Sequence, residues 1–204
     1  TEYLQHYYDI HGVPLRTKLI ANITLINKIG NLFSPIIFNL IANNKFFGKF
    51  IKNIIGFSPQ RQIPNLGKVS TRKWAKNHLK ELNNNKKTKK GKLALFIDEF
   101  TDYNDSDLGI KTIKLLSALG YEIIPLTGYE SGRTFLSKGL LKKSQKIAQK
   151  NVGKLHTLIN SEIPLVGIEP SAILTFRDEY PQIVPQELSF AADSLAKNSF
   201  MIEE

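Results

Sequence analysis

The sequence of 204 residues contains no cysteine. This absence excludes disulfide bridges, thiol nucleophiles, thiolate-bound zinc and iron–sulfur clusters held by cysteine. The sequence also lacks any run near the ~18 consecutive apolar residues of a membrane span, so we expect no segment to cross a bilayer. It begins at Thr1 rather than Met, and no signal-peptide pattern follows. We therefore expect a cytoplasmic location and a piece excised from a longer protein.

Acidic residues are scarce, but only in the first half. Residues 1–91 hold 16 Lys and Arg against three acids, a net charge of +13, whereas residues 92–204 hold 12 against 15 and carry −3. The Lys- and Asn-rich run at 83–91 contains no apolar residue and predicts an exposed linker. We expect three parts: a helical, basic N-terminal region at 1–82, the linker at 83–91 and a second domain at 92–204.

The N-terminal region has apolar residues at helical spacing over 19–26 and 46–55. Pro35 can begin or kink another short segment, and Ser70 or Thr71 can cap a helix that runs to Leu82. Basic amphipathic helices either pack on the rest of their chain or lie on an anionic membrane, and wide apolar faces favour packing. The lysine run lacks interleaved aromatic residues, so we expect no nucleic-acid binding.

The second half alternates apolar runs with amphipathic ones. The pattern predicts strands at 93–97, 121–126 and 163–168, and helices from 105–107 to Gly120, from Ser137 to about Asn160, and from 170–171 toward Arg177. A continuous apolar run such as 93–97 is typical of a strand that is buried on both faces. This rhythm predicts an α/β fold with a parallel β-α-β sheet, preceded by the helical basic extension.

Ligands of an open parallel sheet bind outside the carboxyl ends of its strands, so the loops after the three strands are candidate site loops. They hold a polar group (Asp98, Glu99, Thr101, Tyr103), a second group (Glu130, Ser131, Gly132, Arg133) and a third (Glu169, Pro170, Ser171, Ala172). If the strands are neighbours, the charged side chains of these loops converge. We expect the first group to line a polar pocket.

These loops allow more than one chemistry. Paired carboxylates can do acid–base work or hold a hard cation, and Arg133 beside Glu130 and Glu169 can instead form a structural ion-pair network. We favour the network, because perturbed carboxylates are often structural. No His lies near the loops, which argues against a hydrolytic triad. We assign no catalytic residue and no metal ligand to this chain.

At the same loops the sequence resembles a known family. The stretches 95–126, 130–152 and 163–185, with their Glu-Pro-Ser and Phe-Arg-Asp-Glu-Tyr-Pro runs, resemble the cysteine-rich iron–sulfur portion of FAD-linked oxidoreductases of the glycolate and D-lactate dehydrogenase type. Residues 3–23 resemble the helical segment that follows the ferredoxin-type cluster region in fused members. The resemblance implies a cysteine-rich-domain-like fold and a parent enzyme that carries FAD and 4Fe-4S clusters, oxidises a 2-hydroxy acid and transfers electrons onward.

The sequence departs from the family at the cluster motifs. Cys-Cys-Gly-Arg of the family is Glu130-Ser131-Gly132-Arg133 here, and Glu-Pro-Ser-Cys is Glu169-Pro170-Ser171-Ala172. Carboxylates and hydroxyls are poor substitutes for thiolate ligands of iron. We therefore expect a fragment without a cofactor of its own, which scaffolds the flavin and ferredoxin-type regions of the same protein or a second copy of the domain. Peripheral contact with the inner face of a membrane is a further expectation.

A second interpretation stays open, namely a non-redox ligand-binding or interaction module that kept the fold after losing its cysteines. In either case we expect Arg133 to pair with Glu130, Glu169 or Asp98 and this loop to hold the most constrained charges of the fold. Gly132 is expected to permit a tight backbone turn.

Overall fold

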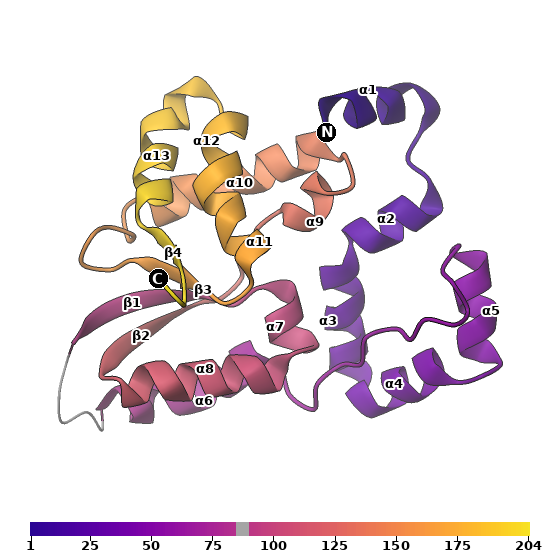
Figure 1. The fold of residues 1–204 in the computed structure, drawn as a ribbon, viewed down its shortest axis with the longest axis horizontal. Coiled ribbons are helices and arrows are strands. Elements are labelled where there is room, and N and C mark those ends of the chain that lie inside the picture. Colours follow the sequence, from indigo (N-terminus) through magenta and orange to yellow (C-terminus); the bar gives the residue numbers. More distant parts are fainter. Residues whose placement is uncertain (85–89) are drawn as a thin grey trace.

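The computed structural model describes residues 1–84 and 90–204 (Figure 1). Within this part, four strands form one parallel sheet in the order β2-β1-β3-β4. They are β1 (Gly91–Phe96), β2 (Tyr121–Leu126), β3 (Leu165–Gly167) and β4 (Ser199–Met201). The predicted α/β fold with a parallel sheet is confirmed. The short strand β4 was not predicted, since its three residues carry too little pattern.

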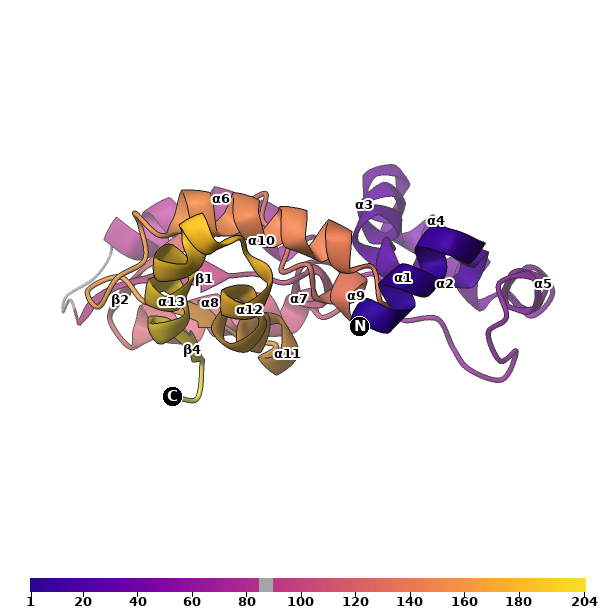
Figure 2. The same cartoon turned by 90° about the horizontal axis from the view of Figure 1, so that it is seen from above.

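Helices cover both faces of the sheet (Figures 1 and 2). Leu93, Leu95 and Ile97 face a layer made by α6 (Thr71–Asn84) and α8 (Ser106–Ala118). Ala94 and Phe96 face the opposite layer. That layer contains α10 (Leu141–Leu155), α11 (Pro170–Leu174), a π-helical turn (Thr175–Glu179), α12 (Tyr180–Ile183), a 3₁₀ turn (Gln186–Leu188) and α13 (Ser189–Lys197). Apolar residues on both sides of β1 explain why its sequence is a continuous apolar run.

The predicted lysine-rich helix from Ser137 to about Asn160 is wrong at both ends. The chain forms α9 (Arg133–Leu136), turns at Gly139 with φ 74°, and begins α10 only at Leu141. Gly139 has a left-handed backbone conformation and turns the chain after α9. The lysine-rich helix therefore begins after this glycine and not at Ser137. After Leu155 the chain turns back and buries Ile159 in the core.

The boundary of the predicted linker also differs. Residues 85–89, most of the segment predicted at 83–91, lie outside the described residues. Helix α6 extends to Asn84, and Asn83 bonds the backbone of Ile123 through both its amide nitrogen (3.0 Å) and its oxygen (3.1 Å). The start of the predicted linker is therefore helical and attached to β2. Gly91, its last predicted residue, begins β1.

The N-terminal region contains α1 (Glu2–His11), α2 (Leu15–Ala21), α3 (Ile23–Phe33), α4 (Pro35–Asn43) and α5 (Phe47–Ile54) before α6. Ala21 packs with Phe135 and Leu140, and Lys142 Nζ lies 2.8 Å from Asp9 Oδ2, so α1 and α2 contact the α9–α10 edge. Helices α4 and α5 extend away from the sheet (Figures 1 and 2). Helix α6, by contrast, is part of the layer on the sheet.

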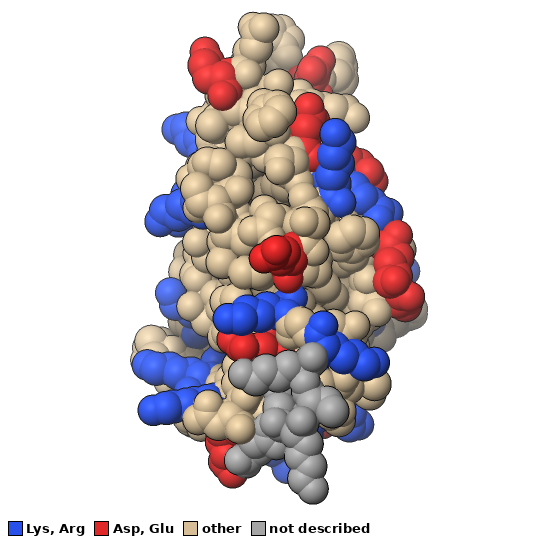
Figure 3. All heavy atoms as spheres, turned by 90° about the vertical axis from the view of Figure 1, so that its left-hand side faces the viewer, with Lys and Arg blue, Asp and Glu red and all other residues tan. Residues whose placement is uncertain are grey.

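No single helix among the described residues is long and apolar enough to span a membrane. Helices α3 and α4 meet the length and composition criterion only as a pair, and they are bent by 117° at the break between them. On the side of the molecule away from α4 and α5, acidic and basic side chains are interspersed on the surface (Figure 3).

Candidate functional site

The three candidate loops meet at the carboxyl edge of the sheet, because β1 lies between β2 and β3. Arg133 Nε of the second loop lies 4.0 Å from Glu169 Oε2 of the third. Beside this pair is an open cleft of about 560 Å³. It is lined by Pro64, Asn65, Phe100, Asn104, Asp105, Arg133 and Glu169. The expected convergence is therefore confirmed for the Arg133–Glu169 pair, and residues 64–65 of the N-terminal region form one wall of the cleft.

The first loop folds into a short helix, α7 (Glu99–Tyr103), with Asp98 as its N-cap. The Asp98 carboxylate accepts hydrogen bonds from Phe100 N (2.8 Å), Thr101 N (3.0 Å) and the Thr101 hydroxyl. These bonds satisfy amide groups that a helix start otherwise leaves without partners. Burial raises the pKa of Asp98 despite them. Asp98 and Thr101, both predicted to line a polar pocket, are buried within the cap.

Glu99 is the unusual group of this loop. Its side chain is 3% exposed, and its Oε2 accepts no hydrogen bond from the described residues. Burial raises the pKa of Glu99 to about 7, and the charges of Asp98 and Glu130 act in the same direction, while Arg133 opposes them. The Glu99 carboxyl group therefore titrates near neutral pH. In Tyr103, which is half-buried, burial and the charge of Asp102 raise the pKa of the phenol.

The second loop is held by its backbone. Asn151 Nδ2 donates to Glu130 O at 2.7 Å, and the Tyr180 hydroxyl donates to Ser131 O at 2.9 Å. Gly132 has φ 77°, so the tight turn predicted there is confirmed. Tyr180 belongs to the Phe-Arg-Asp-Glu-Tyr-Pro run and begins α12, so this run anchors the loop. The run stands out in the sequence, but this role was not predicted from it.

Arg72 is a further residue that the sequence patterns did not single out. Its Nη2 donates to Tyr129 O at 2.7 Å and to Ile97 O, and its Nε lies 3.6 Å from Asp102 Oδ2. Asp102 in turn accepts from Arg72 N (2.9 Å) and from the Ser70 hydroxyl (2.8 Å). Arg72 thus ties α6 to the ends of two strands. Its signal in the sequence is a cation in the first turn of a helix, where the helix dipole disfavours positive charge.

The third loop begins with another helix cap. Glu169 accepts from Ala172 N and from the Ser171 hydroxyl, both at 2.6 Å, and Pro170 takes the first position of α11. The Arg133 and Glu169 side chains are 32% and 28% exposed. The expectation that the 130–133 loop holds the most constrained charges is therefore wrong. Asp98, Glu99 and Asp102 are more buried, because α6 and the segment before it cover α7.

The side chains at this edge do not fit an iron–sulfur cluster. The motif positions offer carboxylate and hydroxyl oxygens and a guanidinium, whereas cluster irons take thiolates. Among residues 1–84 and 90–204, no three acidic or histidine side chains are grouped so that they could hold a metal ion. Two of the oxygen donors, Asp98 and Glu169, are already committed to helix caps. What remains is a polar edge with buried carboxyl groups and the ion pairs Arg72–Asp102 and Arg133–Glu169.

Comparison with known proteins relates the chain to segments of dehydrogenases. It is 26% identical over 191 residues to a D-2-hydroxyglutarate dehydrogenase of Escherichia coli, an alignment that covers 92% of this chain and 19% of that protein. It is 34% identical over 95 residues to the D-2-hydroxyglutarate dehydrogenase of Haemophilus influenzae, covering 46% of this chain and 9% of the relative.

A second kind of relative is one of the subunits of the anaerobic glycerol-3-phosphate dehydrogenase of Escherichia coli. The identity is 24% over 179 residues, which covers 87% of this chain and 44% of that relative. The chain thus spans about a fifth of the longer E. coli relative and less than half of the shorter one. No model of a known protein family matches the chain, and no solved structure matches it. The oxidoreductase relationship therefore rests on these two kinds of dehydrogenase.

Proposed function

We propose that this chain is a cluster-free segment of an FAD-linked dehydrogenase that oxidises a 2-hydroxy acid and passes electrons on through iron–sulfur centres held elsewhere in that protein. One observation carries the proposal. Two loops that correspond to the cluster motifs of the resembling family meet at one sheet edge, and they hold an ion pair and a helix cap where that family has thiolates. The names of the D-2-hydroxyglutarate dehydrogenase relatives support a 2-hydroxy acid as substrate of the whole protein.

Within that protein the segment acts as a scaffold and carries no catalytic residue. Arg72, Asn151 and Tyr180 fix the backbone of the loop that follows β2, through bonds to Tyr129 O, Glu130 O and Ser131 O. A loop whose carbonyl groups are held from three separate elements is rigid. Rigid loops at a sheet edge suit the docking of the flavin region, the ferredoxin-type region or a second copy of the domain.

Anaerobic reconstitution with iron and sulfide tests the cluster-free part of the proposal. The protein should stay colourless, with no absorbance band near ~400 nm. The triple variant Glu130→Cys/Ser131→Cys/Ala172→Cys, which returns thiolates to the motif positions, is the matched comparison and should retain more iron. A stoichiometric cluster in the unchanged protein would contradict the proposal.

The scaffold part is tested by binding. The chain should form a complex of defined stoichiometry with the flavin or ferredoxin-type region encoded in the same reading frame, measured by calorimetry and gel filtration. Exchange of the exposed Arg61 for Gln serves as a control that removes a charge from outside the three loops. Failure to bind any other part of the same polypeptide would remove the scaffold role.

A second candidate function is a non-redox ligand-binding module, favoured by the cleft of about 560 Å³ beside Arg133 and Glu169. A ligand that binds only the folded state raises the midpoint of thermal unfolding. A screen of 2-hydroxy acids and divalent cations should then find a shift that Arg133→Gln abolishes. A flat screen eliminates this candidate and leaves the scaffold proposal unaffected.

A further inference from the structure

Helices α3, α4 and α5 have small and polar residues on the inside and large apolar residues on the outside. Their buried residues are Thr24, Asn27, Gly30, Ala42, Gly48 and Lys52. Their exposed ones include Leu25, Ile29, Leu32, Phe33, Ile36, Ile37, Leu40, Ile41, Phe47, Phe50 and Ile54, and Phe46, just before α5, is exposed with them. A helix on the surface of a protein in water normally shows the opposite arrangement.

The inner contacts show that this inversion is built into the packing. Asn27 Nδ2 donates to Asn104 Oδ1 at 2.8 Å, which fixes α3 against the loop after α7. A Cβ on Gly48 would lie 2.5 Å from Ala42 O, and one on Gly30 would lie 2.6 Å from the Phe38 ring. The glycines allow helices to approach where side chains would not fit. The apolar face cannot be turned inward without losing these contacts.

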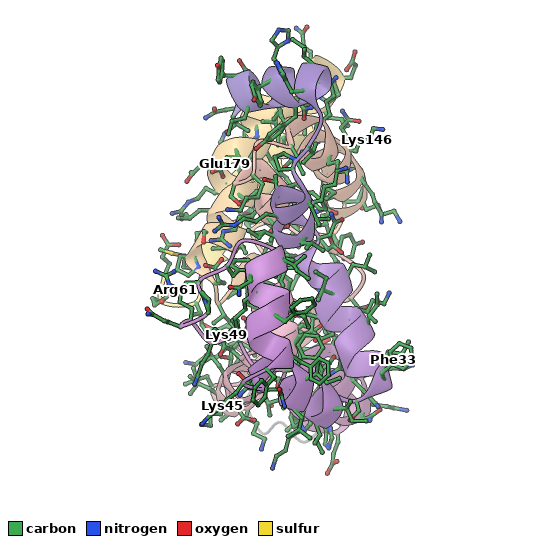
Figure 4. All side chains as sticks on the ribbon, turned by 90° about the vertical axis from the view of Figure 1, so that its right-hand side faces the viewer. Phe33, Lys45, Lys49, Arg61, Lys146 and Glu179 are labelled. Carbon is green, nitrogen blue, oxygen red and sulfur yellow. The ribbon has the colours of Figure 1, made fainter. Side chains whose placement is uncertain are left out.

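The segment that carries this face has charges of one sign. No acidic residue occurs between Asp9 and Glu81, while the same stretch holds 12 Lys and Arg. Lys28, Lys45 and Lys49 are exposed on or beside the three helices. In Figure 4, Lys45 and Lys49 lie along one side of this region, with Phe33 on the other. An apolar face on a segment that carries cations and no acidic residue is complementary to a layer of hydrocarbon under anionic headgroups.

We propose that the outer face of α3–α5 binds an anionic phospholipid surface and lies in the headgroup layer of one leaflet. The three helices have 11, 9 and 8 residues, and α3 and α4 meet at 117°, so they fit a position in the plane of the interface. A protein partner is the less favoured occupant. The interface with such a partner would have an apolar core bordered by a polar rim, and the partner would have to supply all the acidic side chains of that rim. The inference is independent of the proposed dehydrogenase relationship.

Sedimentation of the chain with vesicles tests the proposal. The protein should pellet with vesicles of phosphatidylcholine that contain about 30% phosphatidylglycerol, and much less with pure phosphatidylcholine. Binding should weaken in about 0.5 M NaCl, because salt screens the lysines. Lys45→Gln/Lys49→Gln should weaken it by about fivefold per lysine. Phe33→Ser/Phe46→Ser, at side chains that are 82% and 85% exposed, should weaken it at least about tenfold.

Matched controls come from helices outside α3–α5. Lys146→Gln/Lys150→Gln on α10 and Phe190→Ser on α13 remove the same kinds of exposed side chains from outside the face, and they should leave vesicle binding unchanged. Gel filtration without lipid distinguishes a second copy of the chain as the occupant. Absence of vesicle binding, self-association that the Phe33/Phe46 variant abolishes without any lipid binding, or equal losses in variants and controls would each overturn the proposal.

Discussion

The α3–α5 segment and the sheet with its two helix layers bury opposite kinds of side chain. In the sheet part, Phe96, Phe176 and Leu195 are fully enclosed, and apolar residues fill both faces of β1. In α3–α5, Asn27 and Lys52 are enclosed, whereas Phe33 and Leu32 face outward. Burial of apolar side chains therefore stabilises the sheet part in water. The outer apolar face of α3–α5, in contrast, is buried only when another surface covers it.

The two regions differ in electrostatics as well. The sheet edge encloses the carboxyl groups of Asp98, Glu99 and Asp102, of which Asp98 caps α7 and Asp102 is paired with Arg72. The N-terminal segment carries exposed lysines, among them Lys45 and Lys49, beside an apolar face. Substitutions should therefore act on folding stability in the sheet part and on surface binding in α3–α5. The following substitutions test this division in order of expected effect.

The largest contrast is between two phenylalanines. Phe176 is buried, and its ring centroid lies 4.8 Å from that of Phe96 and 4.7 Å from that of Tyr180. We expect Phe176→Ala to lower the free energy of unfolding by about 4 kcal/mol, because it leaves a cavity. Phe33→Ala should change it by less than about 0.5 kcal/mol. Urea unfolding followed by circular dichroism measures both, and comparable losses would contradict the division.

The next contrast is between two arginines. Arg72→Met removes the donors to Tyr129 O and Ile97 O and the cation beside Asp102. Because Asp102 is buried, we expect a cost of about 3 kcal/mol in the free energy of unfolding. Arg61→Met removes an exposed cation of the N-terminal region and should cost less than about 0.5 kcal/mol. The same urea titration compares them, and a cost for Arg72→Met as small as that for Arg61→Met would show that the network is not stabilising.

The third prediction concerns the pH dependence of stability. The pKa of Glu99 is about 7 in the folded state, against 4.5 as its ordinary value. The folded protein therefore binds the proton more tightly, and the resulting stabilisation is fully present below pH 4.5 and is lost as the pH rises through 7. Glu99→Gln, which stays neutral, should be more stable than the unchanged protein at pH 8, by at most about 3 kcal/mol, and equal to it at pH 4.

Thermal unfolding midpoints of the two proteins over this pH range provide the measurement. Subtraction of the two curves removes the contribution of Glu179, whose pKa burial also raises. A difference that does not depend on pH would show that Glu99 is not the group that titrates.

The smallest effect is expected at the motif loop. Arg133 and Glu169 are about a third exposed and 4.0 Å apart, so solvent screens their attraction. Arg133→Gln should lower the free energy of unfolding by less than about 1 kcal/mol, measured by urea titration. A cost near that of Arg72→Met would support the original expectation that the 130–133 loop holds the most constrained charges of the fold.

Several features of the fold follow from local sequence. The apolar run at 93–97, the strand at 121–126, the Ser70 cap of α6 and Pro35 at the start of α4 all lie close to where the pattern predicts them, whereas Asp105 precedes α8 without a side-chain cap bond. Each depends on neighbours within a few residues, such as the alternation of a strand or the bond from a cap to the next turn. The convergence of the three loops follows in turn from the parallel order of the strands.

Other features were decided by contacts between residues far apart in the sequence. Asp102 is paired with Arg72, and Asn151 and Tyr180 donate hydrogen bonds to the backbone of the loop at 130–131. The lysine-rich helix starts at Leu141 because Gly139 turns the chain. Helical spacing in α3 and α5 reveals an apolar face but not whether it points inward, since periodicity is the same for both orientations. The packing of Gly48 on Ala42 and the bond from Asn27 to Asn104 decide the orientation. They place the small and polar residues of these helices on the inner side, so that the apolar face points outward.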